Sequence, residues 1–199
     1  VECMYKKLTL LSLLAFSLNL SAFESTKQFK SVDLDFVLAN TAKANKFAFS
    51  FPEMNLLDQR NQITQLHELF DKDQNVVFAF FFTHCVSVCT TVTLSLKSIQ
   101  PDLPENTQIV MISIDPENDT PDILNNYANM HKIKNPNWHL LTGSNKQIID
   151  LQKNFEAYRG NKMNHSTSLF VKRSNSTEII EIKSNFSVIP QLFNTASKS

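Results

Sequence analysis

Two cysteines separated by three residues, Cys85 and Cys89, are the side chains of this 199-residue sequence best placed to do chemistry. They follow an apolar run, "NVVFAFFF", and precede a segment with helical spacing. At such a junction, unpaired N–H groups and the positive end of the helix dipole favour the thiolate form of cysteine. Both disulfide exchange and metal binding require a thiolate. The residues alone therefore leave three alternatives: a structural disulfide, a redox catalyst and a metal site.

Two arguments count against a purely structural disulfide. A bridge between Cys85 and Cys89 would close a very short loop and remove little conformational entropy from the unfolded chain. A chain of this length also builds a core large enough to fold without a bridge. A metal site is geometrically feasible, because Cβ atoms at helical positions i and i+4 lie about 5–6 Å apart. Two metal–thiolate bonds of roughly 2.3 Å can span the resulting gap between the sulfur atoms.

The five histidines are the other candidate metal ligands. His84 is next to Cys85, but neighbouring residues at the end of a strand point to opposite sides, so we do not expect it to be a ligand. His165 precedes a predicted strand, where a histidine usually finds a local hydrogen-bond partner. The remaining three fall in segments predicted as helix or loop and are expected at the surface: His67, His131 and His139.

The first 22 residues predict a signal peptide or an N-terminal membrane anchor. Two lysines are followed by an apolar run over residues 8–20 and then by small residues at positions 21 and 22, the order typical of a cleavable secretory signal. The run is shorter than the roughly 20 residues that span a bilayer, which favours cleavage. Cys3 lies within these 22 residues, before the two lysines, so an exported domain holds only Cys85 and Cys89, in a compartment where disulfides persist.

The rest of the chain is predicted to form a polar tether over residues 23–45 and one globular domain over residues 46–199. Apolar residues make up 42% of the sequence, a globular composition. Lys+Arg and Asp+Glu both total 19, which leaves a formal net charge of zero. Binding to nucleic acid through a basic surface is therefore not expected.

Apolar periodicity predicts an α/β domain with a central mixed β-sheet flanked by helices. Thr120 is expected as a helix N-cap with Pro121 at the first helical position. The predicted strands lie at 47–51, 61–64, 75–82, 107–115, 165–173 and 177–183. The predicted helical segments lie at 63–70, 90–99, 120–133, 144–158 and 188–196.

Four segments of the chain resemble the Sco/SenC family in sequence and in order: "FFTHCVSVC", "ISIDPENDTPDILNNYA", "LLTGS" and "NHSTSLFV". The resemblance covers roughly Phe47 to Lys183. It implies a thioredoxin-like fold and a copper chaperone that takes part in the assembly of cytochrome c oxidase. The C-x-x-x-C pair, the D-P-x-x-D-T-P run and the lone histidine before a strand are specific when they occur together.

The resemblance implies that Cys85, Cys89 and His165 are the three copper ligands. Two thiolates suit Cu(I), and an added imidazole gives a set that also holds Cu(II). A site with so few ligands can pass its metal to a partner. Asp115 is expected to line the neighbouring loop, whereas Asp119 and Thr120 are expected to cap the following helix.

The chain departs from the family pattern near the cysteines and in the acidic run. Val86 and Thr90 replace the prolines that commonly follow each cysteine, and Phe81–Phe82 replaces a glycine in the strand. Asn118 stands where a basic residue is usual. The three ligand types are unaffected, but copper affinity, redox potential and partner contacts are open to change.

The main alternative is a thiol–disulfide oxidoreductase that acts on envelope cysteine pairs through Cys85 and Cys89. Thioredoxin-type enzymes usually carry C-x-x-C and a proline before a late strand, whereas this chain has C-x-x-x-C and His165, Ser166 and Thr167 before "SLFV". A peroxiredoxin is disfavoured because no proline precedes Thr83 in the required spacing. The third hypothesis is a structural domain whose two cysteines form an unreactive disulfide.

We therefore expect a copper chaperone rather than an enzyme, located in the bacterial periplasm and either free after signal cleavage or anchored to the inner membrane. The expected partner is the cytochrome c oxidase subunit that carries the recipient copper site. Other copper carriers or thiol reductants are further possible partners.

Overall fold

The computed structural model describes residues 45–48, 51–84, 88–164 and 167–194. The predicted signal segment and all but the last residue of the tether lie outside these ranges. Within the described ranges, no helix is both long enough and apolar enough to cross a membrane.

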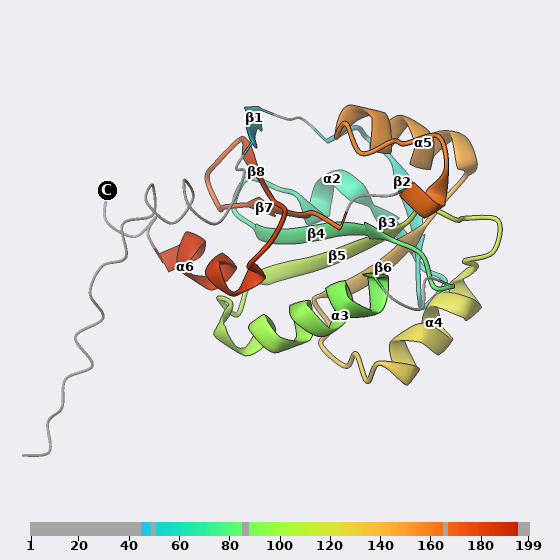
Figure 1. The fold of residues 1–199 in the computed structure, drawn as a ribbon, viewed down its shortest axis with the longest axis horizontal. Helices are drawn as coiled ribbons and strands as arrows, with labels where there is room; N and C mark the ends of the chain where they lie inside the picture. Colours follow the sequence, from blue (N-terminus) through green and yellow to red (C-terminus); the bar gives the residue numbers. More distant parts are fainter. Residues whose placement is uncertain (1–44, 49–50, 85–87, 165–166, 195–199) are drawn as a thin grey trace, which may run out of the picture. The chain divides into compact units, whose positions relative to one another are not determined.

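The domain is built on one mixed sheet of eight strands in the order β1-β8-β7-β4-β5-β6-β2-β3 (Figure 1). The strands β4, β5 and β6 are parallel to one another, and the outer pairings are antiparallel. The strands are β1 (Asn45–Ala48), β2 (Asn55–Asp58), β3 (Ile63–Gln65), β4 (Asn75–Phe81), β5 (Thr107–Ser113), β6 (Trp138–Thr142), β7 (Leu169–Lys172) and β8 (Glu178–Ile182). The predicted mixed sheet is confirmed.

Helices cover both faces of this sheet. In Figure 1, α3 and α4 lie below the sheet, and α2 and α5 lie above it. The helices are α2 (Leu66–Leu69), α3 (Val88–Ile99), α4 (Pro121–Met130), α5 (Asn145–Asn154) and α6 (Ile189–Asn194). Short 3-10 turns are η1 (Gln100–Asp102), η2 (Lys162–Asn164) and η3 (Phe186–Val188).

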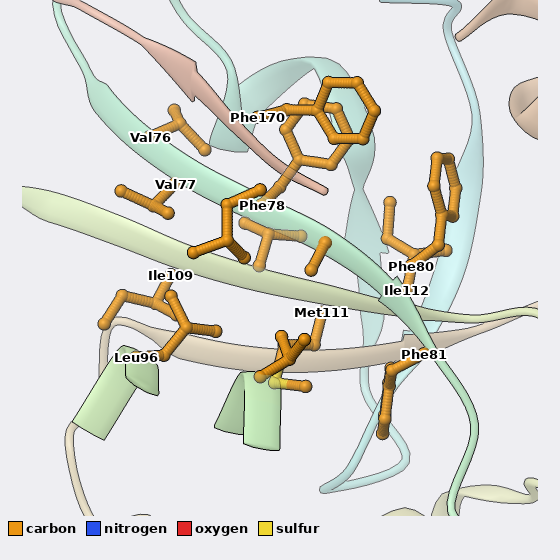
Figure 2. Close-up of a cluster of buried hydrophobic side chains, with 14 of the residues drawn as sticks. Val76, Val77, Phe78, Phe80, Phe81, Leu96, Ile109, Met111, Ile112 and Phe170 are labelled. Carbon is orange, nitrogen blue, oxygen red and sulfur yellow. The ribbon is translucent and has the colours of Figure 1, made fainter. Parts of the chain in front are cut away.

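The central strand β4 is buried along its whole length, as its continuous apolar run predicts. Its side chains alternate between the two faces (Figure 2). Phe78 stacks on Phe170 of β7, with ring centroids 4.7 Å apart, and also contacts Phe155 after α5. Phe81 points to the other face and contacts Tyr127 of α4. The strand that leads to the cysteines is therefore fixed by aromatic packing on both sides.

Strands β2 and β3 differ from the prediction. The predicted strand over 61–64 begins two residues later, at Ile63, because Asn61 has a positive φ of 60° and belongs to the turn between β2 and β3. The Asp58 carboxylate accepts hydrogen bonds from the backbone N–H groups of Arg60 and Gln62 and so fixes this turn. Strand β2 itself was not predicted.

Strand β6 was also missed by the sequence analysis, which left 134–143 without an element. It pairs in parallel with β5, with Trp138 opposite Ile109 and His139 opposite Val110. His139 is therefore a strand residue, and the prediction that it lies in a helix or loop was wrong. Its neighbours Trp138, Leu140 and Leu141 are fully buried.

Candidate metal centre

The predicted cysteine pair falls at the junction of β4 and α3, where the sequence predicted it. Cys89 is the second residue of α3, the helix that follows β4 in the chain. Cys85 and His165, together with the side chain of Cys89, lie outside the described part of the structure.

A buried carboxylate, Asp119, holds the segment that leads to Cys85. Thr83 donates to Asp119 twice, from its backbone N–H to Oδ2 at 3.0 Å and from Oγ1 to Oδ1 at 2.5 Å. Ser113, the last residue of β5, donates its hydroxyl to Oδ2 at 2.5 Å. Asp119 is fully buried, so these three bonds replace the water that the carboxylate loses. The carboxyl ends of β4 and β5 are joined through this one side chain.

A second carboxylate in the same loop, Asp115, holds the segment that leads to His165. Lys162, in η2, donates Nζ to Asp115 Oδ2 at 2.5 Å. Asn118 donates its amide to the other carboxylate oxygen at 3.0 Å. The Lys162 ammonium also lies 5.8 Å from the centroid of the Phe82 ring. Lys162 is three residues before His165, and the sequence analysis did not single it out.

The helix cap after this loop was predicted correctly for one residue and wrongly for the other. Thr120 is the N-cap of α4 and accepts from the backbone N–H of Ile123, with Pro121 at the first helical position. Asp119 does not cap the helix, because its side chain turns back towards Thr83 and Ser113. A short polar residue before a helix satisfies the cap pattern wherever its side chain points.

A hollow of about 240 Å³ lies beside the Asp115–Lys162 pair. It is bordered by the β5–α4 loop, by α5 and by residues 157–162. At its rim, Asn145 donates to the carboxylate of Glu117 at 2.5 Å. This side of the loop is therefore open to solvent and polar.

The described histidines do not supply an alternative ligand set. His84 is exposed, with Nδ1 3.3 Å from Thr83 Oγ1. His139 is half-buried and pairs through Nε2 with Gln108 of β5 at 3.1 Å. Burial and, secondarily, the Arg60 guanidinium lower the pKa of His139, while Asp58 raises it. Burial and Lys97 likewise lower the pKa of His131.

No three His, Cys, Asp or Glu side chains gather in a metal-binding arrangement among the residues that the structure describes. The side chains of the candidate ligands Cys85, Cys89 and His165 are not among the described ones.

The sequence matches the family model SCO1/SenC over residues 43–190. It is 35% identical over 74 residues to the SCO1 protein homolog of Bacillus subtilis (strain 168). That match covers 36% of this chain and 38% of the relative, so the chain spans about two fifths of the length of that protein.

Solved Sco structures share the fold. BsSco, a member of the Sco family of cytochrome c oxidase assembly proteins in which a disulfide switch was identified, aligns with a TM-score of 0.62 and 23% identity, covering 77% of this chain and 96% of BsSco. Copper-bound ScoI of Bradyrhizobium japonicum aligns with a TM-score of 0.57 and 19% identity, covering 76% and 94% of the two chains. At these identities the likeness establishes the thioredoxin-like fold. The match to the family model covers most of this chain and shows that the chain belongs to the SCO1/SenC family.

Proposed function

We propose that this protein is a copper chaperone that binds one copper ion through Cys85, Cys89 and His165 and delivers it during the assembly of cytochrome c oxidase. Membership of the Sco family supports the assembly role, since that family is one of oxidase assembly proteins. Copper is supported by the copper-bound state of the related ScoI.

The observation that carries the proposal is that one loop, residues 115–120, holds the flanks of both ligand-bearing segments. Asp119 binds Thr83, two residues before Cys85, and Asp115 binds Lys162, three residues before His165. Only two or three residues of chain therefore connect each anchored residue to its proposed ligand, at about 3.8 Å between consecutive Cα atoms. The segments that lead to Cys85 and to His165, about 80 residues apart in sequence, are thus anchored to the same loop.

The chemistry of the donor set fits copper. Two thiolates are soft ligands that select Cu(I), and an imidazole adds a nitrogen ligand suited to Cu(II). The amino end of α3, where Cys89 lies, favours the thiolate form. Three ligands leave a position open through which a partner's ligands can take over the ion.

The proposed location is the cell envelope, the bacterial periplasm, with residues 1–22 as the export signal or anchor. The proposed partner is the oxidase subunit that receives copper. Both follow from the sequence pattern at the N-terminus and from the family's role in oxidase assembly.

The decisive experiment compares copper binding by the purified chain and two histidine variants. The wild type should bind one copper and show thiolate-to-Cu(II) absorption. His165→Ala should lose most of this absorption yet keep Cu(I), because both thiolates remain. His84→Ala is the matched control, since His84 adjoins Cys85 but is exposed, and its spectrum should equal that of the wild type. An unaltered spectrum for His165→Ala would rule out the three-ligand site.

A thiol–disulfide oxidoreductase is the second candidate, favoured by the thioredoxin-like fold and by the disulfide switch identified in BsSco. In that case, reduction of a small disulfide substrate by dithiol-treated protein should survive His165→Ala and be lost in Cys85→Ala. For a copper chaperone, by contrast, His165→Ala should lose Cu(II) binding in the metal-binding assay.

A further inference from the structure

We infer that Lys162 is a positioning residue: its ion pair with Asp115 holds the segment that carries His165 against the same loop that holds the cysteine segment. The inference rests on the proposed function, because it assigns a role to Lys162 in the Cu(II) form of the proposed site.

The cysteine side of the loop is fixed by a fully buried carboxylate. Asp119 accepts from the backbone and hydroxyl of Thr83 and from the hydroxyl of Ser113. Charge-assisted hydrogen bonds of this kind are about twice as strong as neutral ones. Phe81 and Phe82, which precede Thr83, are also buried. The chain therefore enters the cysteine segment from a fixed point.

The histidine side of the loop depends on a longer-range contact. Asp115 is 7% exposed, and its carboxylate accepts from Lys162 Nζ and from Asn118. Lys162 and Asp115 are 47 residues apart in sequence. The Lys162 side chain is 40% exposed, whereas that of Asp115 is 8% exposed, so the acidic partner is shielded from water. A shielded partner makes this pair stronger than an ion pair between two exposed side chains.

The two anchors belong to one hydrogen-bonded unit. The hydroxyl of Ser113 donates to Asp119 and accepts from the backbone N–H of Asp115 at 3.0 Å. The backbone N–H of Asp119 in turn donates to the carbonyl of Asp115 at 2.8 Å. Through these bonds, a displacement of Asp119 also displaces Asp115. The loop sets the relative position of the two flanking segments rather than each one separately.

This arrangement assigns unequal effects to the two oxidation states of copper. Cu(I) is satisfied by the two thiolates, whose flank is held by Asp119. Cu(II) needs the imidazole, whose flank is held by Lys162. Loss of the Lys162 ammonium should therefore weaken Cu(II) more than Cu(I). Groups that orient metal ligands typically change affinity by about 10–100-fold when they are removed.

The test is Lys162→Met in the full chain, with Lys162→Arg and Lys146→Met as companions. Lys146→Met is a matched control: it removes a lysine from an exposed ion pair, to Asp150 at 2.6 Å on α5. Affinities for Cu(II) and Cu(I) are measured by competition with chelators. Amide hydrogen exchange of residues 160–164 in copper-free protein reports the same contact without metal, since Asn164 N–H donates to the Asn161 carbonyl in η2.

Lys162→Met should lower Cu(II) affinity by about tenfold, shift the thiolate-to-Cu(II) absorption and leave Cu(I) affinity within about threefold. Exchange at 160–164 should accelerate. Lys162→Arg should restore the Cu(II) spectrum, because a guanidinium also reaches the carboxylate, and Lys146→Met should match the wild type. Wild-type Cu(II) binding by Lys162→Met would overturn the inference alone. Failure of the wild type to bind copper would overturn the proposed function, and the inference with it.

Discussion

The buried carboxylate of Asp119 connects the carboxyl ends of β4 and β5. It is fully buried and receives two donors from Thr83 and one from Ser113. A buried carboxylate is tolerated only when its oxygens are hydrogen-bonded. The same bonds that stabilise the charge therefore join β4 to β5 at the point where the cysteine segment begins.

Asp119→Asn should lower the free energy of unfolding by about 2 kcal/mol, because the amide loses the charge and places N–H donors against existing donors. Urea denaturation at neutral pH measures the change. Asp122→Asn is the matched control, since Asp122 is exposed in the first turn of α4, and it should change stability by less than about 0.5 kcal/mol. Equal stability of the two variants would contradict the role given to Asp119.

At this scale the sequence predicted residue types better than residue partners. Thr120 was assigned correctly as an N-cap because a cap is a local contact with a strong preference. Asp119 was assigned wrongly because its partners lie 36 and 6 residues away in sequence. The Asp115–Lys162 pair was missed for the same reason, since a lysine in a loop carries no signal of its partner.

Lys172, like Asp119, is a buried charged residue that connects two elements: it joins the end of β7 to the loop before β4. The residue is 5% exposed, and its ammonium donates to the backbone carbonyls of Asp71 at 2.7 Å and Gln74 at 3.1 Å. Burial lowers the pKa of Lys172, whereas Asp71 and Asp73 raise it. The carbonyl bonds therefore offset a real desolvation cost.

Lys172→Met should destabilise the domain by about 1–2 kcal/mol, because the loop carbonyls lose a charged donor while the desolvation cost of the ammonium is also removed. Thermal or urea unfolding measures the difference. Lys183→Met is the control: Lys183 is exposed and pairs with Glu181 at 3.4 Å, and its loss should cost less than about 0.5 kcal/mol. A Lys172→Met variant as stable as the wild type would contradict the proposed link.

Elements with strong periodicity were predicted well. Strands β4 and β5 contain continuous apolar runs, and α3 carries Val92, Leu96 and Ile99 at helical spacing, all of them buried. Strand β6 was missed because it is only five residues long and His139 interrupts its apolar pattern. Its strand character comes from pairing with β5, a tertiary contact that local patterns do not contain.

In the folded domain, the candidate site lies at the carboxyl ends of the parallel strands. Helices cover both faces, and the β4–α3 junction and the β5–α4 loop meet at the carboxyl ends of parallel strands. Open α/β sheets bind ligands at this kind of edge. The sequence motifs identified the loop and the candidate ligands, whereas the contacts that hold their flanks together became visible only in the folded chain.

X-ray absorption at the copper edge identifies the ligands of the proposed site, measured for the copper-loaded chain, for His165→Ala and for the His84→Ala control. In the Cu(II) form, the wild type and His84→Ala should each show two sulfur neighbours and one imidazole. His165→Ala, which is expected to retain Cu(I), should be loaded with Cu(I) and should then keep the sulfur neighbours and lose the imidazole scattering. Imidazole scattering that persists in His165→Ala, or a wild-type spectrum without sulfur, would contradict a copper site formed by Cys85, Cys89 and His165.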